Sequence, residues 1–489
     1  MTRIAARTRK TRSCNPALAL VASLAVSACG TDQGKGDPTP GAGQTSSNGG
    51  SSVSGGSGGT GGSATGKGGM STNGGAKSGG GANTRGGETS SNGGVSGGKG
   101  GGTSASGGAK NAGGASASGG SSPGNGGANT SGGTTQTGAV TAASIAMRLG
   151  RKPNFLIGMG NDLASDHSKD GAYTLGVTLD LHYAYLVGLK GEGGWPDWNA
   201  NGTFVNVLTD TAKANGVTPM FTLYAMAARG ENNLSALQDK AYMQAYWDGV
   251  KLMYQRLAVF DGPSAVNFEP DFWGYLQQGS KNDPTSLMVS VTDTAPDCAG
   301  LPNNVVGLGK CLVALGRRYA PKAVLGFHVS GWADGDPKAI IKFMLAVGAG
   351  EADMVTTDTL DRDAGCFEAG QDQNCARGGS FYWDETNKTS PNFHEHLAWV
   401  KTITTGIGRP MLWWQTPFGV PSDTPGGTPG HYRDNRVRYI FSHIQEFIDA
   451  GGVGAAFGTG AGNQTYIDSD GDQFKTAVTK YLAAPVALP

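Results

Sequence analysis

The sequence has no excess of charge of either sign. Lys and Arg together number 38, and so do Asp and Glu, which gives a formal net charge of zero over 489 residues. A protein that binds nucleic acid without sequence preference carries a basic excess or a basic stripe that neutralises phosphates. The balanced charge therefore argues against nucleic acid as a partner.

Several short motifs of known chemistry are also missing after residue 135. No G-x-G-x-x-G follows the first predicted strand and no G-K-[ST] occurs, which weakens the nucleotide-binding folds. The absence of a G-x-S-x-G elbow disfavours a serine esterase. His394-Glu395-His396 lacks the H-E-x-x-H spacing of zinc hydrolases. We therefore expect neither a metal nor a cofactor.

A hydrophobic run long enough to span a membrane is missing near the N-terminus. Residues 17–25 are apolar and follow five basic residues, but a spanning helix needs ~20 apolar residues. This combination predicts a signal peptide over residues 1–28. The ending Val26-Ser27-Ala28-Cys29 resembles the bacterial lipobox, which implies a lipid on Cys29 and an exported protein anchored at the cell surface or the periplasmic face. The alternative is an ordinary signal with an incidental cysteine.

Large apolar residues are scarce from residue 29 to residue 135. Gly, Ser, Thr, Asn and Ala dominate this stretch, which holds 41 of the 84 glycines. Such a composition cannot bury enough apolar surface to offset the entropy of ordering the chain. We expect a disordered linker with an r.m.s. reach of about 50–60 Å. It would carry one globular domain, residues 136–489, which we expect to be a monomer.

Cysteine is rare, and four of the six cysteines lie in the globular domain. Cys298 and Cys311 are close in sequence, and so are Cys366 and Cys375. In an oxidising compartment this arrangement predicts two local disulfides. The spacings match no zinc pattern.

The globular domain repeats one pattern eight times. A short apolar run is followed by a loop rich in Gly, Asp and Trp, and then by apolar residues at helical spacings of three and four. Strands that alternate with helices indicate a parallel α/β fold, and eight units favour a closed (β/α)8 barrel of the TIM type. The predicted strands are residues 154–158, 176–181, 218–223, 265–269, 323–328, 354–357, 410–415 and 453–457.

Reactive groups of a (β/α)8 barrel lie where the strands end and the following loops begin. Polar and aromatic residues are concentrated at these positions. In strand order they are Asn161 and Asp162; Asp180, His182 and Tyr183; Tyr224; Glu269 and Asp271; His328 and Trp332; Asp358, Asp361 and Asp363; and Trp413, Trp414 and Gln415.

Seven of the nine tryptophans fall at predicted strand ends or in the following loops, and only two fall in predicted helices. Aromatic faces around a polar cleft suit sugar rings, which offer C–H faces for stacking and hydroxyls for hydrogen bonds. The alternative for some of them is the packing of loops onto the barrel rim. We expect a polysaccharide or oligosaccharide to contact Trp273, Trp332, Trp413, Trp414, His182, Tyr224, His328 and Gln415.

Glu269 is the best single candidate for a catalytic residue. A carboxyl at the end of strand four, beside Trp273, can have its pKa raised by desolvation and serve as a general acid. The alternative is a structural carboxyl that is hydrogen-bonded inside the barrel mouth.

The segment Asn267-Phe268-Glu269 resembles the large clan of barrel glycosidases. The resemblance implies that Glu269 is the acid/base and that a second glutamate, the nucleophile, ends strand seven. Residues 266–276 are also similar to the Glu-Pro-Asp segment of family 6 cellobiohydrolases. The chain departs from the clan at Gln415, which stands where the nucleophile belongs, and a glutamine cannot serve as one.

These observations predict a surface-anchored glycoside hydrolase, and Gln415 leaves an inverting mechanism open. Glu269 would act as the acid and Asp358 or Asp180 as the base, across a gap of roughly 6.5–9.5 Å, or Asp271 would share the work. A non-catalytic glycan-binding lipoprotein is the alternative that Gln415 motivates. A metal-dependent phosphodiesterase is a third, and it needs a metal cluster that includes His182 or His328.

Overall fold

The computed structural model describes residues 140–160, 171–370, 375–376, 381–425, 427–459 and 463–489. The predicted signal peptide, Cys29, the linker, Asn161 and Asp162 lie outside the described residues. Within the described ranges, no helix is long and apolar enough to cross a membrane.

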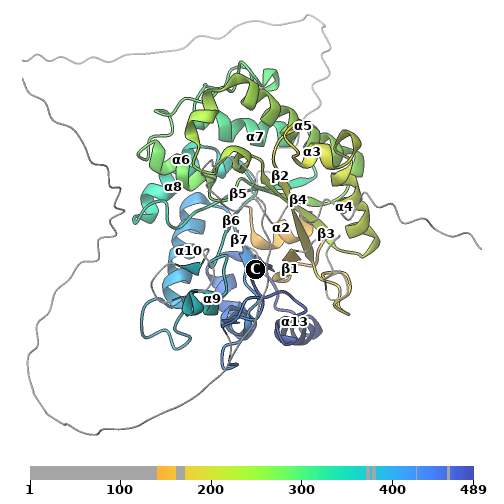
Figure 1. Ribbon diagram of the computed structural model, residues 1–489, viewed down its shortest axis with the longest axis vertical. Helices are drawn as coiled ribbons and strands as arrows, with labels where there is room; N and C mark the ends of the chain where they lie inside the picture. Colours follow the sequence, from red (N-terminus) through yellow and green to blue (C-terminus); the bar gives the residue numbers. More distant parts are fainter. Residues whose placement is uncertain (1–139, 161–170, 371–374, 377–380, 426, 460–462) are drawn as a thin grey trace, which may run out of the picture. The chain divides into compact units, whose positions relative to one another are not determined.

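Eight parallel strands close into a barrel in the order β1-β10-β7-β6-β5-β4-β3-β2, which confirms the predicted fold (Figure 1). The strands are buried on both faces, because helices cover the outer face and side chains fill the interior. Seven strands lie within two residues of their predicted bounds, and strand two is the exception. The strands are β1 (Leu156–Gly160), β2 (Leu181–Val187), β3 (Thr218–Tyr224), β4 (Ser264–Phe268), β5 (Ala323–His328), β6 (Met354–Thr357), β7 (Met411–Thr416) and β10 (Gly452–Phe457).

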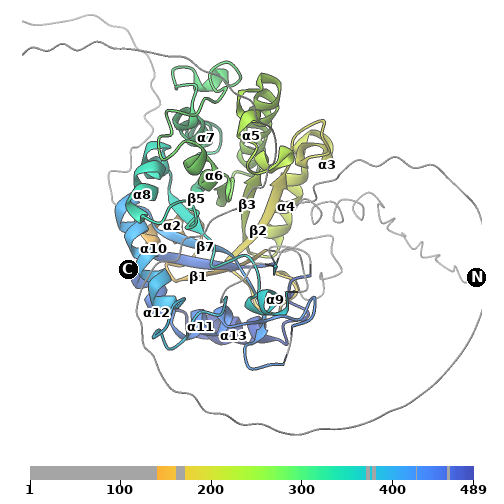
Figure 2. The same ribbon diagram turned by 60° about the vertical axis from the view of Figure 1, so that its left-hand side comes forward.

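Helices surround the strands (Figures 1 and 2). Four of the longer helices begin at an Asp or Asn side chain that accepts backbone N–H groups of the first turn, namely Asp239, Asn304, Asp336 and Asn392. A two-residue ladder, β8 (Val420–Pro421) with β9 (Arg433–Asp434), follows β7. The helices are α2 (Ala142–Arg148), α3 (Trp195–Trp198), α4 (Phe204–Ala214), α5 (Lys240–Phe260), α6 (Phe272–Gly279), α7 (Val305–Tyr319), α8 (Pro337–Ala346), α9 (Ala364–Ala369), α10 (Phe393–Ile407), α11 (Arg436–Ser442), α12 (Ile444–Asp449) and α13 (Gln473–Ala483).

Large aromatic side chains fill one side of the barrel interior. The ring centroids of Tyr183 on β2 and Trp414 on β7 are 6.0 Å apart. A side chain at Gly160 of β1, or at Gly458 just after β10, would overlap the Tyr183 ring. The glycines of these two neighbouring strands therefore make the space that the aromatic pair occupies.

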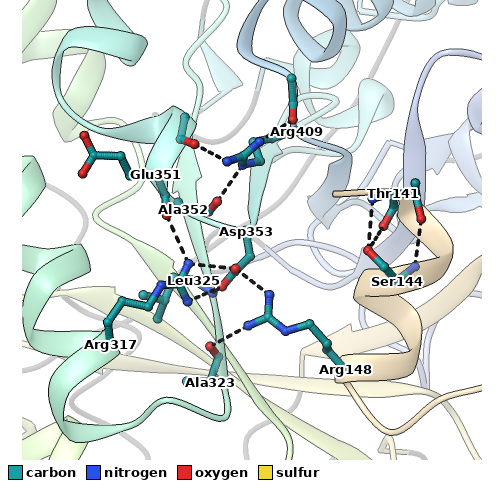
Figure 3. Close-up of polar contacts among 12 residues, drawn as sticks. Thr141, Ser144, Arg148, Arg317, Ala323, Leu325, Glu351, Ala352, Asp353 and Arg409 are labelled. Atoms are coloured by element: carbon teal, nitrogen blue, oxygen red, sulfur yellow. Dashed lines mark hydrogen bonds and ion pairs between the residues drawn. The ribbon is translucent and has the colours of Figure 1, made fainter. Parts of the chain in front are cut away.

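A charge cluster around the buried Asp353 lies at the amino-terminal ends of β5 and β6, beside helix α2 (Figure 3). Asp353, just before β6, accepts hydrogen bonds from Arg148 of α2 at 2.5 Å, from Arg317 of α7 at 2.8 Å, and from the backbone N–H of Leu325 at 2.8 Å. Burial alone would raise the pKa of Asp353, but the two arginines outweigh burial and lower it. One carboxylate thus joins α2, α7, β5 and β6.

Both predicted disulfides are present. Cys298 pairs with Cys311, which joins α7 to the loop before it. Cys366 pairs with Cys375, and Phe367 and Tyr432 pack with them in a small separate apolar cluster.

We expect Asp353→Asn to lower the free energy of unfolding by about 2–3 kcal/mol, because two arginines lose a nearly buried partner. Because the pKa of Asp353 is lowered in the folded state, its contribution to the free energy of unfolding is present above about pH 4 and is lost as the pH falls further. The variant should therefore lose less stability on acidification than the wild type. Chemical denaturation at several pH values measures both effects.

The control is Glu351→Gln, which removes an exposed ion pair with Lys310 and should cost at most ~1 kcal/mol. Equal effects of the two substitutions would contradict the role assigned to Asp353.

Candidate active site

The carboxyl ends of β4, β5 and β6 bring Asp271, His328 and Asp358 together. The backbone N–H of Asp271 faces Nδ1 of His328 at 3.4 Å. Asp358 keeps some solvent access but is densely surrounded by protein atoms. This burial raises the pKa of Asp358; the charge of His328 opposes the rise, the charge of Asp271 adds to it, and Arg362 again lowers the pKa. The three side chains therefore form one electrostatic unit.

Glu231 and Arg362 complete this unit, and sequence reasoning missed both. Glu231 lies half-buried in the loop after β3. Burial and the charge of Asp271 raise its pKa to about 7, and Arg362 opposes the rise. The available signal was the polar stretch Gly230-Glu231-Asn232-Asn233, which closely follows a predicted strand.

Trp332 forms an exposed aromatic platform beside these carboxyls. Its side chain is 43% exposed, and its indole N–H donates to Oδ1 of Asp271 at 3.2 Å. The ring lies against Gly274 of α6, where a Cβ would come within 2.7 Å of it, and its centroid is 4.8 Å from that of Tyr275. One hydrogen bond therefore ties the platform to a carboxyl of the cluster.

Buried donors line the floor under the cluster. In the described part of the chain, Nε2 of His328, Nε1 of Trp414 and Nδ2 of Asn267 have no hydrogen-bond partner. The Asn267 amide is oriented by Thr356, which donates to its Oδ1 at 2.7 Å, and the His328 and Trp414 rings are 5.6 Å apart. Buried polar groups of this kind pair with water or with a ligand.

Two tyrosines extend the aromatic surface on the β2–β3 side. Tyr224, the last residue of β3, is half-buried, and its ring lies 6.0 Å from that of Tyr185. Tyr185 in turn lies 5.7 Å from Trp414. Of the residues expected to contact a sugar, Tyr224, His328, Trp332 and Trp414 thus lie around the mouth.

Glu269 is turned away from the mouth. It is 1% exposed, and its two oxygens accept the backbone N–H groups of Ala225 and Met226 at 3.2 and 3.1 Å. Burial raises its pKa to about 8, against the lowering effect of these hydrogen bonds and of Tyr246. The raised pKa that was expected for Glu269 is present, but its contacts match the structural alternative of a carboxyl that is hydrogen-bonded inside the barrel.

Asp180 and His182 also lie away from the site, because strand two runs over Leu181–Val187 and begins where it was predicted to end. Asp180 precedes the strand, at the α2 end of the barrel, and accepts the backbone N–H of Ile157 at 2.9 Å. His182 faces outward and contacts the hydroxyl of Tyr173 at 2.5 Å. The predicted position of Asp180, at the carboxyl end of strand two, is therefore wrong.

Trp273 and Trp413 pack between the barrel and its helices. The indole of Trp273 donates to the Phe268 carbonyl at 2.9 Å. The indole of Trp413 donates to Nε2 of His396 on α10 at 2.8 Å. Both are buried, so their assignment to sugar contact is corrected to a packing role.

Gln415 is buried near the end of β7, and its Nε2 donates to the Thr459 carbonyl at 3.3 Å.

Among the described residues, no group of three or more His, Cys, Asp or Glu side chains is arranged to hold a metal ion. The phosphodiesterase alternative therefore has no such cluster to rest on in this part of the chain.

Four of the eleven non-glycine residues with positive φ in the described ranges lie at the mouth end of the barrel. They are Glu269 (42°) and Asp271 (64°) after β4, Leu360 (86°) after β6, and Gln415 (54°) on β7. Left-handed non-glycine residues cost about 1–3 kcal/mol each. The other seven lie elsewhere in the chain, so backbone strain does not by itself single out the mouth.

No protein-family model matches the chain, and no curated protein matches it. Solved structures with a similar fold include the endo-β-1,4-mannanase of Thermotoga petrophila, with 15% identity, a TM-score of 0.39, and coverage of 68% of this chain and 77% of that one. The endoglucanase Cel6 of Mycobacterium tuberculosis has 14% identity and a TM-score of 0.29, over 57% of this chain and 76% of that one. D-Psicose 3-epimerase of Clostridium cellulolyticum H10 has 14% identity and a TM-score of 0.34, over 67% and 99%. At these values the likeness carries no argument about activity.

We expect Glu269→Gln to lower the free energy of unfolding by about 1–3 kcal/mol, because the new NH2 group faces one of two buried backbone N–H groups. Because the pKa of Glu269 is raised in the folded state, its contribution to the free energy of unfolding is present at acidic pH. That contribution is lost as the pH rises through about 8. The wild type should therefore lose more stability than the variant between pH 6 and pH 9. Complete loss of activity with unchanged unfolding curves would contradict the structural role.

Proposed function

We propose that this chain is a glycoside hydrolase of polysaccharides or oligosaccharides, and that the cluster of Asp271, Glu231 and Asp358 carries the reaction. The observation that supports this most is the hydrogen bond between Asp271 and the exposed indole of Trp332. It places a carboxyl directly beside a surface on which a sugar ring stacks. The donors on the floor, His328 and Trp414, supply hydrogen bonds for sugar hydroxyls.

Glu231 is the proposed general acid. A carboxyl with a pKa of about 7 is partly protonated at neutral pH and can donate to the glycosidic oxygen. Asp271 is the proposed base that activates the attacking water, and this pairing of acid and base describes an inverting enzyme. Burial and the charge of Asp271 raise the pKa of Asp358 against the opposing charge of His328, and Asp358 tunes the charge of the pair.

Rates on two kinds of substrate test this assignment. We expect Glu231→Gln to slow polysaccharide cleavage about 10²–10⁴-fold but to affect much less an aryl glycoside whose leaving group needs no proton. We expect Asp271→Asn to lose both activities and to regain rate when azide replaces water as the nucleophile. Asp248→Asn, on the exposed face of α5, is the matched control.

Binding of oligosaccharides without any turnover would instead support the non-catalytic glycan-binding lipoprotein, which Gln415 motivates. Turnover that survives both Glu231→Gln and Asp271→Asn would move the reaction away from this cluster.

We also propose that the chain works outside the cytoplasm, held at a membrane by a lipid on Cys29. The lipobox-like sequence supports the lipid, and the two disulfides support an oxidising compartment. The linker would hold the barrel away from the surface.

Cys29→Ala should move the exported protein from the membrane fraction to the soluble fraction, because acylation needs the thiol. Cys14→Ala, within the predicted signal peptide, should leave it in the membrane fraction. Immunoblots of fractionated cells measure the difference, and an unchanged distribution of Cys29→Ala would contradict the anchor.

A further inference from the structure

We propose that the sugar bound on the Trp332 platform carries a free ammonium group, so that the substrate is a polysaccharide of amino sugars with unacylated amines. This inference rests on the proposed function and adds the substrate class.

Acidic groups outnumber basic ones around the platform. Glu231, Asp271 and Asp358 interact with one another's charge or with a shared neighbour, Arg362. Arg362 is itself paired with the adjacent Asp361, and His328 is the second basic group that acts on Asp358. Among the described residues, four carboxyls thus share one guanidinium and one imidazole. A cation bound here would reduce the repulsion among these carboxyls.

The orientation of Trp332 suits a cation. Its indole N–H edge points to Oδ1 of Asp271, and the ring lies against Gly274 and near Tyr275. The ring remains 43% exposed, which leaves aromatic surface for a ligand. The face of an indole attracts a positive charge through its quadrupole, and here the ring stands beside a carboxylate.

The same geometry disfavours the other sugar classes. A uronic acid would place its carboxylate next to Asp271 and Glu231 and would be repelled. A neutral or N-acetylated sugar would stack on Trp332 but would leave the excess of acidic groups uncompensated. The floor donors, Nε2 of His328 and Nε1 of Trp414, then bind hydroxyl oxygens in every class and do not discriminate among them.

The test compares matched pairs of oligosaccharides that differ only in N-acetylation, on several backbones, with the full chain. We expect the free-amine member to bind about fivefold to tenfold more tightly, the ratio expected for one added charge contact near a protein surface. Calorimetry measures the affinities, and the ratio should shrink as salt is added. A ratio of one or below on every backbone overturns the inference.

Two variants should change this ratio in opposite directions. At a pH above 7, where Glu231 is mostly ionised, Glu231→Gln removes a negative charge and lowers the ratio, whereas Arg362→Gln removes a positive charge and raises it. Asp248→Asn, far along the outer face of α5, leaves it unchanged. Changes in the same direction for Glu231→Gln and Arg362→Gln would mean that charge is not the cause.

Hydrolysis is scored separately, so that the two proposals fail separately. Cleavage of neutral or acetylated polymers with no preference for free amines overturns the substrate class and leaves the hydrolase standing. Preferential binding of free amines with no cleavage supports the cation site and overturns the hydrolase. No binding of any oligosaccharide overturns both.

Discussion

The packing of Tyr183 and Trp414 inside the barrel determines where a ligand can bind. These two rings occupy the space that the glycines of β1 and the β10 end leave free, so the interior on that side is filled. The polar groups that remain, Asp271, His328 and Asp358, collect at the ends of β4, β5 and β6 on the other side. The Trp414 and His328 rings are 5.6 Å apart in an edge-to-face arrangement, so they connect the filled side of the interior to the polar side.

Carboxylates at the two ends of the barrel differ in how far neighbouring groups compensate their charge. At the α2 end, Asp353 is satisfied by two arginines and a backbone N–H, and its pKa is lowered (Figure 3). At the mouth, Glu231 and Asp358 have raised pKa values and share Arg362. A fully compensated carboxylate stabilises the fold, whereas carboxyls with raised pKa values and few compensating charges are candidates for chemistry or ligand binding.

The barrel was predictable because its strands are short apolar runs at regular intervals, and the disulfides were predictable from cysteine spacing. The site was only partly predictable from the sequence. Periodicity could not show that β2 begins after Asp180, and it could not tell which of Trp413 and Trp414 faces inward. Glu269 ends an obvious strand, but a positive φ turns its side chain toward the backbone of Ala225 and Met226. Glu231 lies in a polar stretch that closely follows a predicted strand, but the sequence does not show that this loop reaches Asp271.

The most direct test of the proposed site is a crystal structure of the Asp271→Asn protein with a bound oligosaccharide. The account predicts one sugar ring stacked on Trp332, with the adjoining glycosidic oxygen within hydrogen-bond distance of the Glu231 carboxyl and hydroxyls on His328 and Trp414. A sugar bound elsewhere, with Trp332 and Glu231 still facing solvent, would contradict it.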